Sequence, residues 1–215
     1  MIATNALLSA RPPGYKKQVI TWKINDTTSI NNIKPIVLGS PKIVGDVNDK
    51  SVMFDGVDDG LIMPVNPLEG LKNFTVELLF KPVVSDSLAP RILHIQDNEG
   101  NRCTIELRIT KQGKWYLDAF LKNGRLNKGL TLFDTSKKHL CDQWYWVALT
   151  YDGTTMTQYV DGVKEGAGTV VMNTMTSGQT SIGVRLNHIN WFKGQVKELL
   201  FSSVALKPEF MQRKK

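Results

Sequence analysis

The chain has 215 residues, of which 41% are hydrophobic and 22% are charged, so it can form a packed core and wholesale disorder is excluded. Its 27 Lys and Arg against 20 Asp and Glu give a net charge of +7, but the basic residues are scattered and form no nucleic-acid-binding motif. No apolar run approaches the ~18 residues of a membrane span. We therefore expect one domain with neither a nucleic-acid site nor a membrane-spanning segment.

Short runs of alternating polar and apolar residues recur along the chain, bounded by Gly, Asp, Asn and Pro, which is the pattern of an all-β protein. Helical periodicity is limited to a short stretch near 207–213 and another after Pro67. The alternation predicts a β-sandwich of two antiparallel sheets. In chain order, the expected strands are 19–23, 34–38, 51–54, 60–63, 73–81, 91–96, 102–110, 115–122, 144–151, 156–160, 168–172, 180–185 and 195–201.

Turn signals show how some of these strands pair. A Lys-Gln-Gly turn at 111–113 joins the strands on either side of it into a hairpin. Asp-Gly pairs at 152–153 and 161–162 favour tight turns, because glycine takes positive φ without a steric penalty. They predict a meander of three antiparallel strands around 156–160.

Neither the cysteines nor the histidines form a metal or redox motif. Cys103 and Cys141 lack CxxC spacing, and His94, His139 and His188 are far apart in the sequence. A disulfide needs Cα atoms within ~7 Å of each other. Nothing in the local sequence holds Cys103, in a predicted strand, close to Cys141, which precedes one. We predict that both are free, buried thiols.

Three segments of the chain, at 51–64, 143–166 and 181–210, carry motifs that resemble parts of laminin-G-like, concanavalin A-like domains. Segment 51–64 (SVMFDGVDDGLIMP) is similar to the FDGVDDYV-type segment of these domains. Segment 143–166 (QWYWVALTYDGTTMTQYVDGVKEG) resembles their WHHVALTYDG…YVNGV strand pair, and 181–210 is similar to their closing IG…FKGxIDEVRIYNRALSPEE sequence. The resemblance covers nearly the whole chain.

This resemblance implies a laminin-G-like jelly-roll domain at 19–210, between an N-terminal extension at 1–18 and a basic tail at 211–215. Related domains often bind carbohydrate in the groove of a concave sheet. We therefore expect a non-catalytic, carbohydrate-binding, lectin-like module of an exported protein, located outside the cell, in the periplasm or at the cell surface, whose leader is absent from this chain. Because fold alone does not confer this function, two alternatives stay open: a glycoside hydrolase, and an adhesion domain that binds a protein partner.

Charged residues at alternate positions predict a polar face on the concave sheet. Glu106 and Arg108 share one side of their strand, and Asp118 shares the corresponding side of the hairpin partner. Aromatic rings beside them can stack on sugar rings. The residues expected to bind ligand are Glu77, Glu106, Arg108, Trp115, Tyr116, Asp118, Arg185 and Trp191.

The enzyme alternative would use carboxylates of the same face. Glycoside hydrolysis needs two carboxyl groups about 5–9 Å apart, and Glu77, Glu106 and Asp118 are the candidates. Laminarinase-type relatives carry an E-x-D-x-x-E strand, whereas TIELRI at 104–109 supplies a single acid. A binding role is therefore expected over catalysis.

Calcium is the one cofactor that the resemblance suggests. Several relatives hold Ca²⁺ with Asp side chains, and Asp55, Asp58, Asp59 and Glu198 are the candidate ligands here. Lys197 stands where relatives often have an acid, and the Asp-Gly pairs of this segment are also typical turn formers. A calcium site and a plain turn therefore both remain open for this segment.

Overall fold

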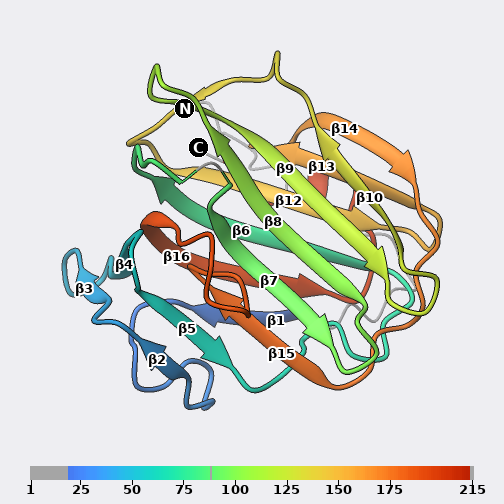
Figure 1. Ribbon diagram of the computed structural model, residues 1–215, viewed down its shortest axis with the longest axis horizontal. Helices are drawn as coiled ribbons and strands as arrows, with labels where there is room; N and C mark the ends of the chain where they lie inside the picture. Colours follow the sequence, from blue (N-terminus) through green and yellow to red (C-terminus); the bar gives the residue numbers. More distant parts are fainter. Residues whose placement is uncertain (1–18, 88, 214–215) are drawn as a thin grey trace, which may run out of the picture.

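Two antiparallel sheets of eight strands each lie face to face in the computed structural model of the chain, which describes residues 19–87 and 89–213 (Figure 1). The predicted all-β sandwich is confirmed. Within these residues the helical structure is one 3-10 turn, η1 (Pro208–Phe210), in a stretch expected to be helical. The residues after Pro67 form turns instead of a helix. The expected N-terminal extension lies outside the described residues.

The two sheets are called here the back sheet and the front sheet. The back sheet has the order β14-β13-β12-β6-β16-β4-β3, with β1 also paired to β16, and the front sheet has the order β10-β9-β8-β7-β15-β5-β2, with β11 also paired to β9. The back-sheet strands are β1 (Val19–Lys23), β3 (Lys42–Val44), β4 (Ser51–Asp55), β6 (Phe74–Pro82), β12 (Tyr145–Tyr151), β13 (Thr155–Val160), β14 (Val163–Thr169) and β16 (Lys193–Ser202). The front-sheet strands are β2 (Ile36–Leu38), β5 (Gly60–Met63), β7 (Arg91–Asp97), β8 (Arg102–Ile109), β9 (Lys114–Asn123), β10 (Lys128–Phe133), β11 (His139–Leu140) and β15 (Gly178–Ile182).

The predicted β8–β9 hairpin and the β12–β13–β14 meander are both present. The prediction of a strand at 168–172 is wrong. The strand in this region is β14, which begins directly after the turn at 161–162, where Val163 pairs with Val160. Strands β3, β10 and β11 lie outside the predicted strands. The turn residues therefore predicted correctly which of these strands pair, whereas the sequence pattern did not predict β3, β10 and β11.

Strand β15 ends at Ile182, three residues earlier than expected, because of the next residue. Gly183 has φ +82°, and a Cβ atom at this position would lie 2.5 Å from a ring carbon of Phe54. A side chain is therefore disfavoured there by both the backbone conformation and the available space. The chain leaves the sheet at Gly183 and enters the long β15–β16 loop, which carries several candidate site residues.

The hydrophobic core lies between the two sheets, as strand alternation requires. On β6, Phe74, Val76, Leu78 and Phe80 are buried in this core, while Glu77 points to the opposite side of the back sheet. Burying each such large side chain contributes about 1.5–3 kcal/mol relative to exposure. The core thus determines which side of each strand is left to face outward.

Both cysteines are free thiols in the described structure, and both are buried. Burial raises the pKa of the Cys103 thiol far above its ordinary value, and burial together with Asp142 raises the pKa of Cys141 to about 11. Since the thiolate is the reactive species, we expect no reaction of the native protein with a thiol-specific disulfide reagent at pH 8. Unfolding without reductant should expose two reactive thiols per chain. A protein that gives none after unfolding would contradict the free-thiol assignment.

Candidate functional site

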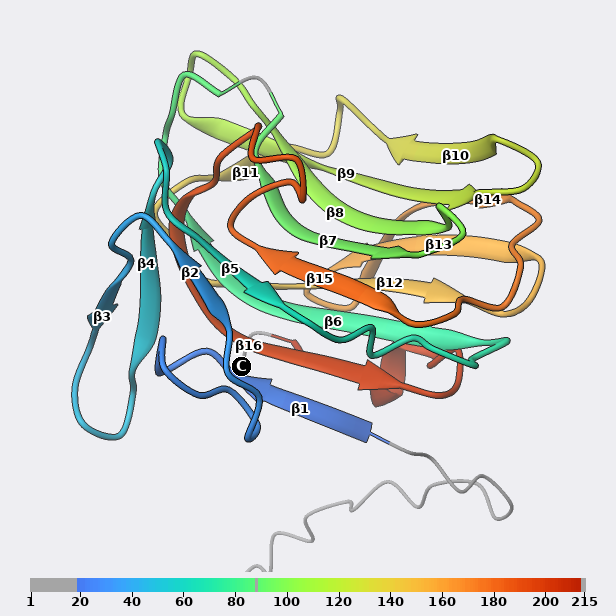
Figure 2. The ribbon, with the colours of Figure 1, turned by 60° about the horizontal axis from the view of Figure 1, so that its bottom comes forward.

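The front face, which is the surface of the front sheet turned away from the back sheet, carries polar side chains on neighbouring strands. Glu106 of β8 lies opposite Arg91 of β7 on one side and Asp118 of β9 on the other. On the same two central strands, Arg108 lies opposite Tyr116. Figure 2 shows β7, β8 and β9 curving together, so that this face is concave. The structure therefore brings these five side chains to one concave surface.

Arginines hold both carboxylates of the front face. Arg91 forms an ion pair with Glu106, and Arg108 Nε donates a hydrogen bond to Asp118 Oδ2 at 2.7 Å. Asp118 is fully buried, and burial raises its pKa against the opposing effect of Arg108. A nucleophile or general base needs a carboxylate that can reach the substrate. In this arrangement each of the two carboxylates is paired with a guanidinium.

Positive side chains surround His94 of β7 on the same face. Burial, followed by the charges of Arg102, Arg91 and Arg185, lowers the pKa of His94 to about 3. The Leu186 N–H group donates to His94 Nδ1 at 3.3 Å, so the β15–β16 loop lies over β7. Burial and then Arg185 likewise lower the pKa of Arg91 to about 10. The imidazole is therefore neutral, and the charge of this region comes from arginines.

The polar network of the front face is incomplete in protein atoms alone. Thr104 Oγ1, Asp118 Oδ1 and the Nε atoms of Arg91 and Arg102 are buried and have no hydrogen-bond partner among the described residues. Leaving such an atom unsatisfied costs about 1–3 kcal/mol, and native proteins satisfy them with water or ligand when protein partners are lacking. The face therefore suits a ligand whose hydrogen-bonding groups can take the place of water at these atoms.

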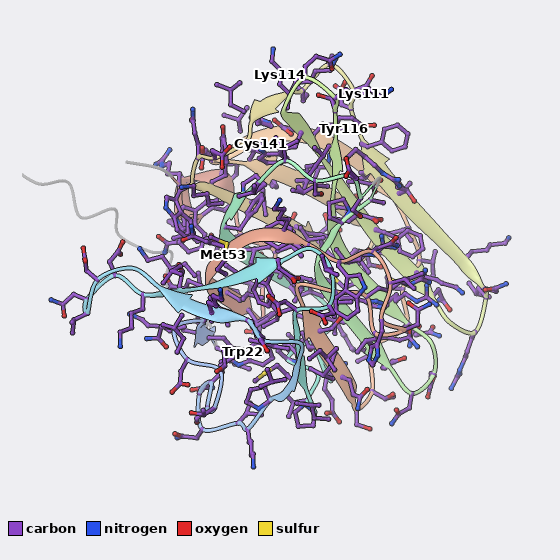
Figure 3. The ribbon with its side chains drawn as sticks, turned by 60° about the vertical axis from the view of Figure 1, so that its left-hand side comes forward. Trp22, Met53, Lys111, Lys114, Tyr116 and Cys141 are labelled. Carbon is purple, nitrogen blue, oxygen red and sulfur yellow. The ribbon has the colours of Figure 1, made fainter. Side chains whose placement is uncertain are left out.

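An aromatic pair lies at the β9–β10 side of the front face. The rings of Tyr116 and Phe133 have centroids 6.3 Å apart, and Phe133 is 57% exposed. Figure 3 shows Tyr116 at the same end of the molecule as Lys111 and Lys114. Exposed rings beside hydrogen-bonding groups are the arrangement that sugar rings stack on. The structure thus places Tyr116 on the front face, and its stacking role stays a prediction.

Arg185 and Trp191 lie in the β15–β16 loop, although Arg185 was expected in a strand. The carbonyl of Asn190 accepts a hydrogen bond from the Arg91 N–H group at 2.9 Å, which fastens the loop beside the front face. Trp191 is half-buried, and its ring centroid lies 6.2 Å from that of His188. Both expected ligand-binding residues thus lie at the rim of the face and not on the sheet.

Trp115 was expected beside the ligand, but it is fully buried between the sheets. Its ring packs against Phe80 and Tyr145, at centroid distances of 5.3 and 5.1 Å, and its Nε1 donates to the Leu140 carbonyl at 3.2 Å. It follows Lys114 and precedes Tyr116 on β9, so it points to the opposite side from Tyr116. The assignment of Trp115 to the ligand site is therefore wrong.

Glu77 was expected on the same face as Glu106, but it belongs to the back sheet. It lies on the outer side of β6, where the C-terminal segment covers it, and the Gln212 N–H group donates to Glu77 Oε1 at 2.6 Å. Met211 of this segment is buried against Ala148 and Tyr159. Alternation places Glu77 outward correctly, yet it cannot tell which of two sheets a strand joins. Glu77 is therefore excluded from the site as either a ligand-binding or a catalytic residue.

The three acidic residues of the β4–β5 turn do come together. One carboxylate oxygen from each of Asp55, Asp58 and Asp59 lies within 4.8 Å of the others. Burial tends to raise the pKa of Asp55, but the backbone N–H groups of the next residues lower it below the ordinary value. Asp59 accepts backbone hydrogen bonds from Ser40 and Asp55. These bonds fit the turn-forming alternative, and the oxygen set is also one that suits Ca²⁺.

Glu198 does not join this acidic cluster. Lys193 pairs with Asp55, and Glu198 is five residues further along β16, which is roughly 16 Å at the rise of a β-strand. The strand also contains a register shift next to Glu198. Including Glu198 with the three aspartates as a metal ligand is therefore wrong.

The front face includes residues that strand alternation missed. Arg91 and His94 are three positions apart, so a regular strand would place them on opposite sides. An irregularity between Arg91 and Leu93 brings both to the front face. Arg102 lies on the same side of β8 as Glu106, so strand alternation could have predicted its place on the front face. Phe133 lies on β10, a strand that was not predicted.

A separate cavity of about 350 Å³ lies at the loops before β6, after β12 and after β14. Tyr151 lines it, and the Tyr151 hydroxyl donates to backbone carbonyls of neighbouring turns. Its lining carries one charged side chain, that of Lys72. The cavity therefore lacks the cluster of charged groups that distinguishes the front face.

Comparison with known proteins finds the same fold in several solved structures. No curated protein matches it significantly. Among solved structures, domain 4 of AbnA, an extracellular GH43 arabinanase from Geobacillus stearothermophilus described in complex with arabinotriose, has a TM-score of 0.64 and 19% identity over 88% of this chain and 93% of that one. A pentraxin from Limulus polyphemus has a TM-score of 0.58 and 19% identity over 77% and 81% of the two chains.

A mutant sialidase from Trypanosoma rangeli has a TM-score of 0.66 and 15% identity, covering 91% of this chain but 32% of the sialidase. At these identities the likeness concerns the fold alone. Between residues 19 and 213, with Leu88 left aside, there is no helix long and apolar enough to cross a membrane. The sequence profile described as the concanavalin A-like lectin/glucanases superfamily matches residues 55–210. With its jelly-roll sheets and this match over most of its length, the chain belongs to the laminin-G-like family of the concanavalin A-like lectin/glucanases superfamily.

Proposed function

We propose that this chain is a non-catalytic, carbohydrate-binding module of an exported protein and that it binds sugar on its front face. The observation that carries the proposal is the concave surface on which half-buried Tyr116 and exposed Phe133 lie beside an incompletely hydrogen-bonded polar network. Sugars present apolar ring faces and hydroxyl groups in alternation, so a ligand of this kind matches both halves of the surface.

Two structural neighbours support the same proposal. The AbnA domain is described in complex with arabinotriose, and a botulinum neurotoxin DC binding domain is described in complex with SialylT. AbnA is extracellular, which agrees with an exported parent protein. These likenesses support carbohydrate binding as a class, and the residues that bind must be tested on this chain itself.

Replacing Tyr116 with alanine is expected to weaken sugar binding about tenfold, which corresponds to about 1.4 kcal/mol, while the melting temperature changes little because the ring is half-exposed. A glycan array with the wild type identifies the ligand, and titration calorimetry then compares wild type, Tyr116→Ala and Phe133→Ala. Val163→Ala is the matched control, because Val163 is 63% exposed on β14 of the back sheet. Binding that survives both ring deletions would contradict sugar binding on this face.

The same experiments decide between this proposal and the remaining alternatives. Running the array with and without EDTA tests whether Asp55, Asp58 and Asp59 hold a calcium ion that binding requires. Hydrolysis of a bound glycan, abolished in both Glu106→Gln and Asp118→Asn, would replace the binding module with a glycoside hydrolase. If no glycan on the array is bound, an adhesion domain that binds a protein partner would be the better explanation of the function.

A further inference from the structure

The front face has more positive than negative charge. Its arginines are Arg91, Arg102 and Arg108, with Arg185 at the rim, and its carboxylates are Glu106 and Asp118. Arg91 pairs with Glu106 and Arg108 pairs with Asp118. Four arginines against two carboxylates leave an excess of two positive charges on this set.

The excess charge belongs to Arg102 and Arg185. No ion pair or hydrogen bond of either side chain is found among residues 19–87 and 89–213, and Arg102 Nε is buried. The two residues lie close together, because Arg102 is opposite Gln96 of β7, two residues from His94, and the N–H group of Leu186, next to Arg185, donates to His94 Nδ1 at 3.3 Å. Burial and then Arg185 accordingly lower the pKa of Arg102. Two partly desolvated positive charges that repel each other are costly without a nearby anion. Histidine adds no charge here, since His94 is neutral at physiological pH.

We propose that the sugar bound on the front face is acidic and that Arg102 and Arg185 bind its carboxylate or sulfate group. This inference rests on the proposed function. A guanidinium matches a planar or tetrahedral oxyanion with two parallel hydrogen bonds, which a neutral hydroxyl cannot accept as strongly. The pair sits between the β7–β8 region of the sheet and the β15–β16 loop, so the anion would be enclosed from two sides.

The distance between the charged and aromatic parts of the face sets the size of the ligand. His94, which accepts a hydrogen bond from the residue next to Arg185, lies on β7, whereas Phe133 lies on β10, three strands away in the sheet order. At the usual spacing of about 4.8 Å between strands, this separation is roughly 14 Å. One sugar ring cannot reach both ends. The ligand is therefore an oligosaccharide whose acidic unit lies at the arginine end while another ring stacks at the Tyr116–Phe133 end.

Matched pairs of acidic and neutralised oligosaccharides test the inference by titration calorimetry. An oligogalacturonate is compared with its methyl ester, and a heparin oligosaccharide with its desulfated form; a neutral arabino-oligosaccharide is the third probe. At least one acidic member should bind about tenfold or more tighter than its neutralised counterpart. The pair that shows this difference identifies carboxylate or sulfate as the bound group.

Arg102→Met and Arg185→Met keep the apolar stem of the side chain and remove its charge. Each should weaken binding of the acidic ligand about tenfold and leave the neutralised ligand unaffected. Arg213→Met is the matched control, because Arg213 is exposed and lies beside the turn at Gly162 of the back sheet. An equal loss in Arg213→Met would show attraction to net charge alone and would overturn the inference.

A measurement on the wild type keeps the inference testable if a variant fails to fold. The imidazole pKa of His94, followed by NMR, should be higher with the acidic ligand bound than with its neutralised counterpart, because an anion offsets the charges of Arg91, Arg102 and Arg185. Equal pKa values and equal affinities for both ligands, with binding still lost in Tyr116→Ala, would overturn this inference and leave the proposed function standing. If no sugar binds to the wild type, both are overturned.

Discussion

Replacing Trp115 with alanine is expected to lower the free energy of unfolding by about 3–5 kcal/mol, the usual cost of truncating a large aromatic side chain in a core. The ring is fully buried between the sheets, where it contacts Phe80 and Tyr145, and its Nε1 hydrogen bond to the Leu140 carbonyl is lost as well. Urea unfolding followed by fluorescence or circular dichroism measures the change. Ligand affinity of the fraction that remains folded should not change.

The neighbouring residue provides the control for this prediction. Tyr116 lies on the same strand and is half-exposed on the front face, so Tyr116→Ala should change the free energy of unfolding by no more than about 1 kcal/mol. The two adjacent substitutions should therefore separate stability from binding. Equal destabilisation by both would show that β9 does not have the register described here.

Acidification from pH 6.5 to pH 4.5 is expected to destabilise the protein through His94, at up to about 1.4 kcal/mol per pH unit. Burial and then Arg102, Arg91 and Arg185 lower the pKa of folded His94 to about 3, whereas Gln96 opposes this shift by a hydrogen bond. The unfolded chain takes up a proton near the ordinary pKa of 6.5. Between these two values the unfolded state binds more protons, so this contribution is complete above pH 6.5 and is lost as the pH falls.

Urea unfolding at several pH values, with wild type and His94→Gln, measures this effect. The variant should be less stable at pH 7, because a buried ring is removed, but its stability should fall about 1 kcal/mol less per pH unit on acidification. His188→Asn is the control: His188 is exposed and has φ +58°, a conformation that asparagine tolerates. Parallel pH profiles for wild type and His94→Gln would contradict the prediction.

Strand alternation predicted part of the site because period two is a local property of the backbone. Glu106, Arg108, Tyr116 and Asp118 lie in one hairpin, whose turn at 111–113 sets the register of its two strands. Within such a hairpin the face of each side chain follows from the sequence alone. By the same rule, Trp115 points to the other side of the sheet from Tyr116, so the alternation of β9 could have predicted that Trp115 is buried.

Other residues of the site depend on contacts between distant parts of the chain. Arg91 reaches the front face through a local irregularity in β7, and Arg185 reaches it because the chain turns away at Gly183 under the ring of Phe54. Glu77 shows the opposite case: its strand has the predicted alternation but pairs with β12 and β16 in the back sheet.

The sequence by itself determined the all-β class, the β8–β9 hairpin, the meander after β12 and the laminin-G-like family. These features depend on side-chain alternation, glycine-containing turns and segment motifs, all of which act within a few neighbouring residues. Only the tertiary structure decided which sheet each strand joins, and with it the separation of Glu77 from Glu106 and the gathering of Arg91, Arg102 and Arg185 around His94. The physical reason is that strand pairing across the sandwich is selected by the packing of the whole core, in which residues far apart in the sequence must fit together.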